Sequence, residues 1–303
     1  MPRALRLSPA RFLAPRGGLM AVPLEPFAQL LAREDTRIDL AQACLLIAQD
    51  AYPALEVERY LGDIERMAMR LRGRMPQTLA AEERVAALNE FLFEDLGYRG
   101  NTEAYYDPRN SYLNEVMDRK VGIPISLAVL YMAVGRRVGL PLEGVSFPGH
   151  FLVRLRLRAG VLVLDPFAAG APQSEAELRE RLQRVIPPGI TDNVPVSELP
   201  LDQFLEAATH RQILARLLRN LKAIYRETDK PERLLEVLNR MLVVAPDSSA
   251  ELRDRGIVYQ RLECYRAALK DLSDYVEREP DAPDFDDVRV RMMELSALCA
   301  RLN

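Results

Sequence analysis

The feature that most constrains the fold of this sequence is a repeat near its C-terminus. The segment YRETDKPERLLEVLNRMLVVAPD (225–247) aligns without a gap with YQRLECYRAALKDLSDYVEREPD (259–281), at an offset of 34 residues. The matching positions are Tyr225 with Tyr259, Leu235 with Leu269, Leu238 with Leu272, and Pro246-Asp247 with Pro280-Asp281. This is the period of tetratricopeptide helix pairs, which bury their apolar faces by stacking on one another. The repeat therefore predicts about two helical units and a closing helix.

Apolar residues also recur at helical spacing across residues 24 to 97. In the segment IDLAQACLLIAQDAYP, Leu40, Cys44 and Ile47 share one face of a predicted helix, and Pro53 follows its end. Amphipathic helices of this kind bury their apolar face. We therefore expect a helical N-terminal part, in which Cys44 is a buried, unreactive thiol rather than a nucleophile.

The pattern changes in the middle of the chain. A stretch rich in Asn, Asp, Pro and Tyr (99–112) predicts a loop. The next stretch, KVGIPISLAVLYMAVGRRVGL (120–140), predicts a helix with Pro124 in its first turn and Gly139 at its end.

A period of two follows the helix. In HFLVRLRLRAGVLVLDPF (150–167), apolar residues alternate with Arg154, Arg156 and Arg158, and Ala159-Gly160 marks a turn. This alternation predicts a β-hairpin with one arginine-lined face. The whole pattern predicts an α+β fold that is mostly α: a helical N-terminal part, a small antiparallel sheet and a C-terminal region of helical repeats.

Composition limits the partners and the kinds of site. The chain has 41 Lys and Arg against 44 Asp and Glu, a formal net charge of -3, which is unlike the basic footprint of a nucleic-acid-binding protein. No apolar run reaches the roughly 20 residues that cross a bilayer. The three cysteines are widely spaced, so neither a disulfide framework nor a metal site is predicted. We expect a cytoplasmic protein with no nucleic-acid or membrane partner and no cofactor.

Three residues of the middle region are candidates for catalysis. Ser126 lies in the first turn of the predicted helix, where free N–H groups and the helix dipole stabilise developing negative charge. The predicted hairpin can place His150 beside Asp165, so that the imidazole acts as a base and the carboxylate orients it. Each residue also has a structural interpretation, since Ser caps helices, His occurs in turns and Asp-Pro ends strands. Both interpretations are open from the residues alone.

The same region carries the motifs of a known family. The run NSYLNEVMDRKVGIPISLAVLYMAVGRRVGLPLEGVSFPGHFLVRL contains Gly-Ile-Pro-Ile-Ser-Leu and Pro-Gly-His-Phe, and Asp-Pro-Phe follows it. In these motifs the chain resembles the SirB regulator family, with a match that spans roughly residues 35 to 280. Those bacterial proteins have a transglutaminase-like core followed by tetratricopeptide repeats. The resemblance implies this fold here, and a protein or peptide partner bound by the repeats.

The resemblance also assigns roles to residues. The wider superfamily is similar to papain-type enzymes, in which a Cys at a helix N-terminus works with a His and an Asp on neighbouring strands. It implies that Ser126, His150 and Asp165 stand at these positions, so that this chain has Ser in place of the catalytic Cys. It further implies Asn110 or Asn114 as a side-chain oxyanion donor, although a turn or capping role explains both residues more simply.

We predict three parts and two alternative functions. Residues 1–23 are expected to be a disordered extension, with an alternative start at Met20; residues 24–205 form the SirB-type transglutaminase-like domain, and residues 206–303 form the repeats. In the first function, the protein is a non-classical or inactivated transglutaminase-like scaffold that regulates through protein contacts of its repeats. In the alternative, it is an amidase, peptidase or acyltransferase that uses Ser126 as nucleophile.

Overall fold

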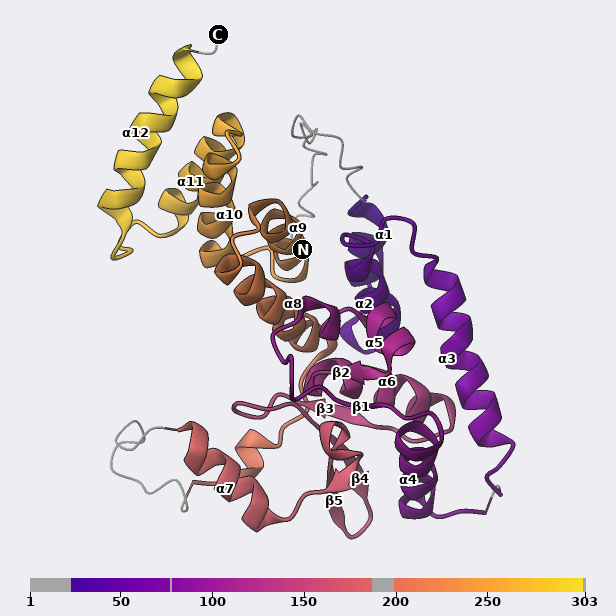
Figure 1. Cartoon of the computed structure of the whole chain (residues 1–303). Coiled ribbons are helices and arrows are strands. Elements are labelled where there is room, and N and C mark those ends of the chain that lie inside the picture. Colours follow the sequence, from indigo (N-terminus) through magenta and orange to yellow (C-terminus); the bar gives the residue numbers. More distant parts are fainter. Residues whose placement is uncertain (1–22, 77, 187–198, 302–303) are drawn as a thin grey trace, which may run out of the picture.

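The computed structural model describes residues 23–76, 78–186 and 199–301 (Figure 1). The extension predicted over residues 1–23 lies outside these ranges except for its last residue. The chain is mostly helical, with a small antiparallel sheet and a C-terminal region of helices, which confirms the predicted fold class. The helices and strands are α1 (Glu25–Leu31), α2 (Leu40–Ala48), α3 (Val57–Arg72), α4 (Ala81–Asn89), β1 (Arg99–Gly100), α5 (Leu113–Arg119), β2 (Val121–Gly122), α6 (Pro124–Arg137), β3 (Glu143–Val145), β4 (Leu152–Leu157), β5 (Gly160–Asp165), β6 (Ala171–Pro172), α7 (Glu175–Val185), α8 (His210–Glu227), α9 (Pro231–Val244), α10 (Ser249–Arg261), α11 (Tyr265–Arg278) and α12 (Phe285–Arg301).

Helix α6 occupies the centre of the core. It begins at Pro124, whose missing N–H has no cost in a first turn, and the extended residue Ile123 precedes it. Most of its residues are buried, and α2, α3, α5 and strand β4 pack around it. Because α6 is apolar on all sides, burial in the core is the arrangement expected for it. The chain turns away at Gly139, whose φ of +82° is a conformation that favours glycine.

The four-stranded antiparallel sheet has the order β3-β4-β5-β6. Strands β4 and β5 form the predicted hairpin, with Val153 opposite Leu164. One face of the sheet, which includes Val153 and Leu155, joins the main hydrophobic core with α6. The other face, which includes Leu152, packs against Leu178 of α7. The sheet is therefore covered on both sides near the end of β5.

The arginine-lined face of the hairpin is buried at one end. Arg156 and Arg158 are exposed, whereas Arg154 is buried. Its Nε donates to Glu143 at 2.8 Å, and its Nη1 donates to the carbonyl of Leu205 at 2.5 Å. The alternation of apolar residues and arginines predicted which residues share this face. It did not predict that the segment of Leu205, before α8, would cover part of the face.

The C-terminal helices form the predicted repeats. The pairs α8/α9 and α10/α11 are followed by the single helix α12. In both units the middle residue of the three between the paired helices is left-handed, with φ of 53° at Asp229 and 57° at Glu263. In both units the following residue donates its N–H to a tyrosine carbonyl: Lys230 to Tyr225 at 3.0 Å, and Cys264 to Tyr259 at 2.9 Å. The same turn conformation therefore recurs with the 34-residue offset of the sequence repeat.

The first helix pair packs on the core, and the later helices extend away from it (Figure 1). Apolar residues of α8 and α9 belong to the main hydrophobic core. A buried ion pair joins Asp50, just after α2, to Arg240 of α9, with N–O distances of 2.9 and 2.7 Å. The hydroxyls of Tyr112 and Tyr225 lie 2.7 Å apart in the same interface. The repeats thus fold back on the core through their first unit.

Candidate functional site

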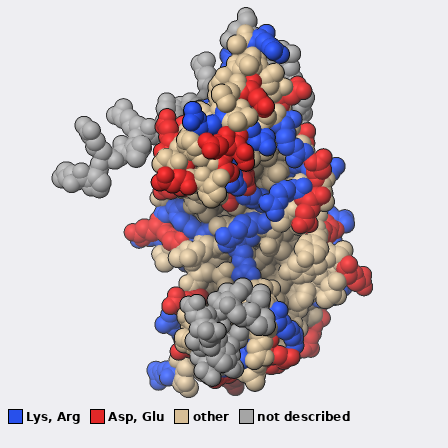
Figure 2. All heavy atoms as spheres, turned by 90° about the vertical axis from the view of Figure 1, so that its left-hand side faces the viewer, with Lys and Arg blue, Asp and Glu red and all other residues tan. Residues whose placement is uncertain are grey.

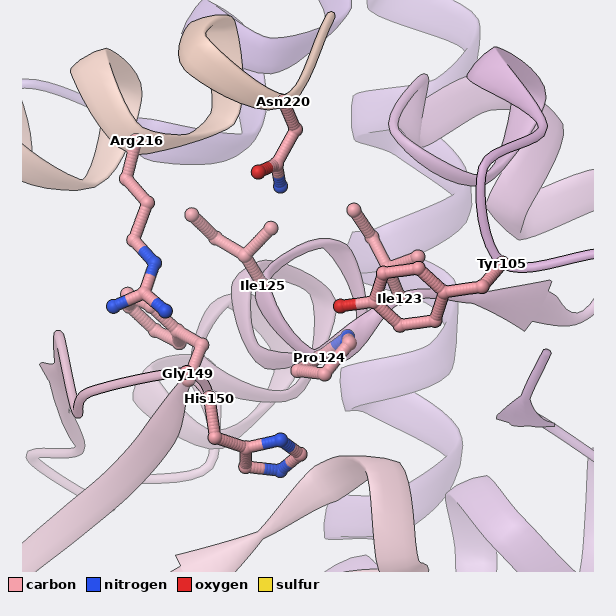
Figure 3. Close-up of a pocket in the computed structure, with 9 residues that line it drawn as sticks. Tyr105, Ile123, Pro124, Ile125, Gly149, His150, Arg216 and Asn220 are labelled. Carbon is pink, nitrogen blue, oxygen red and sulfur yellow. The ribbon is translucent and has the colours of Figure 1, made fainter. Parts of the chain in front are cut away.

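A small pocket lies where the core meets the first repeat (Figure 3). Its walls come from the loop that carries Tyr105, the start of α6, the bend before β4, and α8. Helix α6 contributes Pro124 and Ile125, and helix α8 contributes Arg216 and Asn220. The pocket volume is about 30 Å³, which is room for one or two groups the size of a water molecule.

His150 reaches this pocket from a tight bend. Gly149 precedes it with a φ of +66°, and the N–H of His150 donates to the carbonyl of Phe147 at 3.1 Å. The ring Nε2 of His150 lies 2.9 and 3.0 Å from the two carboxylate oxygens of Asp165. The structure therefore brings His150 and Asp165 together, as the hairpin pattern predicts.

Asp165 is an anion held in place by its surroundings. Its side chain is only 1% exposed. Its carboxylate also accepts the N–H of Phe167 at 3.0 Å and Nη2 of Arg181, from α7, at 2.8 Å. Burial alone raises the pKa of Asp165, but the hydrogen bond from His150 and the charges of His150 and Arg181 outweigh it and hold the pKa below its ordinary value. The carboxylate can thus fix the orientation of the imidazole.

The hydroxyl of Ser126 is engaged elsewhere. Ser126 is 1% exposed, and it is not among the residues that line the pocket. Its Oγ donates to the main-chain carbonyl of Asn110 at 2.6 Å and accepts the N–H of Ile123 at 3.1 Å. A Cβ placed on Gly122 would lie only 2.8 Å from this oxygen, so that side of the hydroxyl is closely covered. The structure therefore holds Ser126 in a capping position at the start of α6.

The two asparagines are buried near this helix start. Asn110 donates from its side-chain amide to the carbonyls of Ala104 and Tyr105, at 2.6 and 3.3 Å, and so shapes the loop that carries Tyr105. The side-chain oxygen of Asn114, in α5, has no hydrogen-bond partner within the described part of the chain. Neither residue lines the pocket. An oxyanion-donor role for either one stays a prediction.

Several polar residues of the site do not follow from the sequence reasoning. Arg216 and Asn220 lie four residues apart on α8, so their spacing shows that they share a face of that helix. Nothing in the sequence shows which part of the core this face covers. Tyr105 and Arg181 are likewise brought to the site only by tertiary packing.

Within residues 23–76, 78–186 and 199–301, no three His, Cys, Asp or Glu side chains are grouped in a way that could hold a metal ion. Over the same ranges, none of the helices combines the length and the hydropathy that crossing a bilayer requires.

Two family models match the chain. A model described as the transglutaminase-like superfamily matches residues 58–219, which is more than half of the chain. A tetratricopeptide repeat model matches residues 221–293. The junction between the two matches falls within α8, the helix that brings Arg216 and Asn220 to the pocket.

Curated bacterial proteins match over most of the chain. A UPF0162 protein of Xylella fastidiosa is 43% identical over 87% of this chain and 92% of its own length. The UPF0162 protein YchA of Escherichia coli is 28% identical over 84% and 90%, and Protein SirB1 of Salmonella typhimurium is 28% identical over 76% and 82%. A crystal structure of menin, 12% identical with a TM-score of 0.40 over 90% of this chain and 69% of menin, is too distant to support a conclusion. The chain belongs to the transglutaminase-like superfamily and, within it, to the bacterial family that contains SirB1 and the UPF0162 proteins.

Proposed function

We propose that this protein is a regulatory scaffold, in which a transglutaminase-like core without acyl-transfer activity is joined to repeats that bind a protein or peptide partner. The observation that carries the proposal is the hydrogen bonding of Ser126. A serine nucleophile requires a base that accepts the proton of its hydroxyl. Here the hydroxyl donates to the carbonyl of Asn110, 2.6 Å away, in a position that is 1% exposed.

The type of residue supports the same proposal. A cysteine is partly ionised near neutral pH and is intrinsically nucleophilic, whereas a serine depends wholly on its base. The base available here, His150, is hydrogen-bonded through Nε2 to Asp165, while the bonds of the Ser126 hydroxyl go to main-chain groups of residues 110 and 123. Ser126 therefore serves as a cap of α6.

The repeats supply the binding part of the proposal. Tetratricopeptide arrays bind peptide segments along the surface that their stacked helices form. Among the described helices of the repeats, α8 and α9 make most of the contact with the core, and α10 to α12 extend away from it with surface available to a partner (Figure 1). The face that includes α7 and the repeats carries charges of both signs, with Lys and Arg gathered along its middle (Figure 2).

Fluorophosphonate labelling of the intact protein tests the absence of acyl transfer. The adduct is read by intact mass and by peptide mapping, with Ser126→Ala and a known serine hydrolase treated alongside. We expect no adduct on Ser126 in folded protein under conditions that label the hydrolase fully. A stoichiometric adduct on Ser126 that is missing from Ser126→Ala would refute the scaffold proposal.

One observation favours a second function. The pair of His150 and Asp165, 2.9 Å apart, has the geometry of a general base and its orienting group. If a local rotation turned Ser126 toward His150, these three residues would form a triad, with Asn110 or Asn114 as oxyanion donor, for an amidase, peptidase or acyltransferase. In that case Ser126 is labelled by fluorophosphonate, and His150→Ala abolishes the labelling.

The proposal includes a cytoplasmic location and a division of the chain into a core and repeats. Cys44, Cys264 and Cys299 are all free thiols, which fits the reducing cytoplasm. We assign residues 24–205 to the core and residues 206–303 to the repeats, with α8 contributing to both.

A further inference from the structure

The pocket contains a guanidinium that has no carboxylate partner among the described residues. Arg216 stacks on Phe151, with its Cζ 5.6 Å from the ring centre. Its Nη1 donates to Ser146 Oγ at 2.7 Å and to the carbonyl of Phe147 at 2.9 Å, which are both neutral acceptors. Within the described part of the chain, the N–H groups on its Nε and Nη2 have no hydrogen-bond acceptor. These donors remain available to a ligand.

Arg216 differs in this respect from one arginine of β4 and one of α7. Arg154 is paired with Glu143, and Arg181 is paired with Asp165. Burial, and then the positive charge of Arg219, lower the pKa of Arg216, and no carboxylate is among the groups that shift it. A partly buried cation without a counter-ion is costly, and an anionic ligand would remove that cost.

Two neutral donors lie around the same space. Figure 3 shows the amide of Asn220 one turn further along α8, and the hydroxyl of Tyr105 on the side of the pocket opposite Arg216. Burial raises the pKa of Tyr105, so its hydroxyl stays protonated and can donate at neutral pH. Guanidinium, amide and phenol together form a set of donors that suits an oxygen anion.

We propose that this pocket binds the carboxylate of a peptide, either its C-terminus or an acidic side chain, through Arg216, Asn220 and Tyr105. The inference rests on the proposed function and deepens it, since it names the chemistry that the scaffold recognises. A guanidinium holds a carboxylate by two parallel N–H···O bonds, which suits the Nε and Nη2 donors of Arg216. The pocket volume of about 30 Å³ admits the end group and leaves the rest of the peptide outside.

Three short probes test this inference. They are N-acetyl-Ala-Ala with a free C-terminal carboxylate, the same dipeptide as its C-terminal amide, and N-acetyl-Asp N-methylamide, whose only carboxylate is its side chain. Each is titrated into the intact ¹⁵N-labelled protein at constant ionic strength, and the amide signals of Tyr105, Ile125 and His150 are followed. We expect at least one carboxylate probe to shift these signals in a saturable way, about tenfold more tightly than the amide probe. The two carboxylate probes distinguish a C-terminus from an acidic side chain.

Substitutions on α8 provide the matched comparison. Arg216→Gln should weaken binding of the carboxylate probe by about tenfold or more. Arg226→Gln is the control, because Arg226 is exposed on the same helix, does not line the pocket and is not among the charges that shift the pKa of Arg216. Arg216→Lys keeps the charge but loses the paired donors, so it should bind with intermediate affinity. It also serves as the test variant if Arg216→Gln does not fold.

The probe titrations and the fluorophosphonate labelling test the two proposals separately. Affinity of both carboxylate probes no higher than that of the amide probe, no response to any probe, or full affinity in a folded Arg216 variant would overturn the carboxylate inference. If Ser126 also stays unlabelled by fluorophosphonate, the scaffold proposal stands without it. Labelling of Ser126 refutes the scaffold proposal whatever the probes show.

Discussion

Replacing Arg240 by Met should destabilise the folded protein by about 3–5 kcal/mol. Arg240 is 0% exposed, and its Nε and Nη2 donate to the carboxylate of Asp50 at 2.9 and 2.7 Å. Without the guanidinium, a buried carboxylate loses its hydrogen-bonded counter-ion and keeps only the charge of Arg233 near it, and this poorly compensated charge is the source of the cost. The guanidinium also lies 4.9 Å from the centre of the Phe27 ring, where a methionine side chain can keep much of the packing.

The ion pair as a whole contributes much less than this loss suggests. Burial raises the pKa of Asp50 even though Arg240 donates hydrogen bonds to it, so desolvation outweighs the attraction within the pair. Replacing both partners, as Asp50→Leu with Arg240→Met, should therefore return the stability to about that of the parent chain.

Urea unfolding of the parent, the two single variants and the double variant gives the required double-mutant cycle. A loss of this size corresponds to a fall in Tm of about 5–8 °C for a chain of this length. Arg66→Met is the control, because the pair of Arg66 with Asp63 is exposed and such pairs contribute about 1 kcal/mol or less. The reasoning fails if the double variant loses the sum of the two single losses, or if Arg240→Met is as mild as the control.

Two further predictions concern the candidate catalytic residues. Ser126→Cys should react with iodoacetamide near neutral pH no faster than free cysteine does, because position 126 is buried and bound to main-chain groups; a faster reaction would indicate an assembled catalytic site. The pKa of Asp165 is lower in the folded protein than in the unfolded chain, where it is about 3.9. The ionised carboxylate therefore stabilises the folded protein above this unfolded pKa, and the stabilisation is lost as the pH falls through the lower folded pKa. Urea unfolding at a series of acidic pH values should show a flatter profile for Asp165→Asn, and matching profiles would contradict this.

Local patterns predicted the elements of the fold because each element reflects residues close together in the sequence. Pro124 and the helical spacing after it predicted the start of α6, and the alternation of apolar residues predicted the β4–β5 hairpin. The hairpin in turn places His150 beside Asp165. The repeat units were predictable for the same reason, since each turn recurs with its own sequence copy.

The orientation of Ser126 and the closure of the pocket depend on contacts that no local pattern reports. Successive residues of a helix are rotated by about 100°, so the position of the helix start decides whether Ile125 or Ser126 faces the pocket. The carbonyl that binds Ser126 belongs to Asn110, in a separate loop. Arg216 reaches the pocket only because α8, far along the chain, packs on the core.

Helix α8 makes the protein hard to dissect. Its apolar side, with Leu214, Leu217 and Leu221, is part of the main hydrophobic core, while the same helix is the first member of the repeat array. Cleavage before α8 would expose those leucines on the C-terminal fragment and remove Arg216 from the pocket, and cleavage after it would leave α9 without its paired helix. Neither fragment would present the surface that the intact molecule offers. Partner mapping therefore calls for point substitutions in the whole chain rather than for truncation.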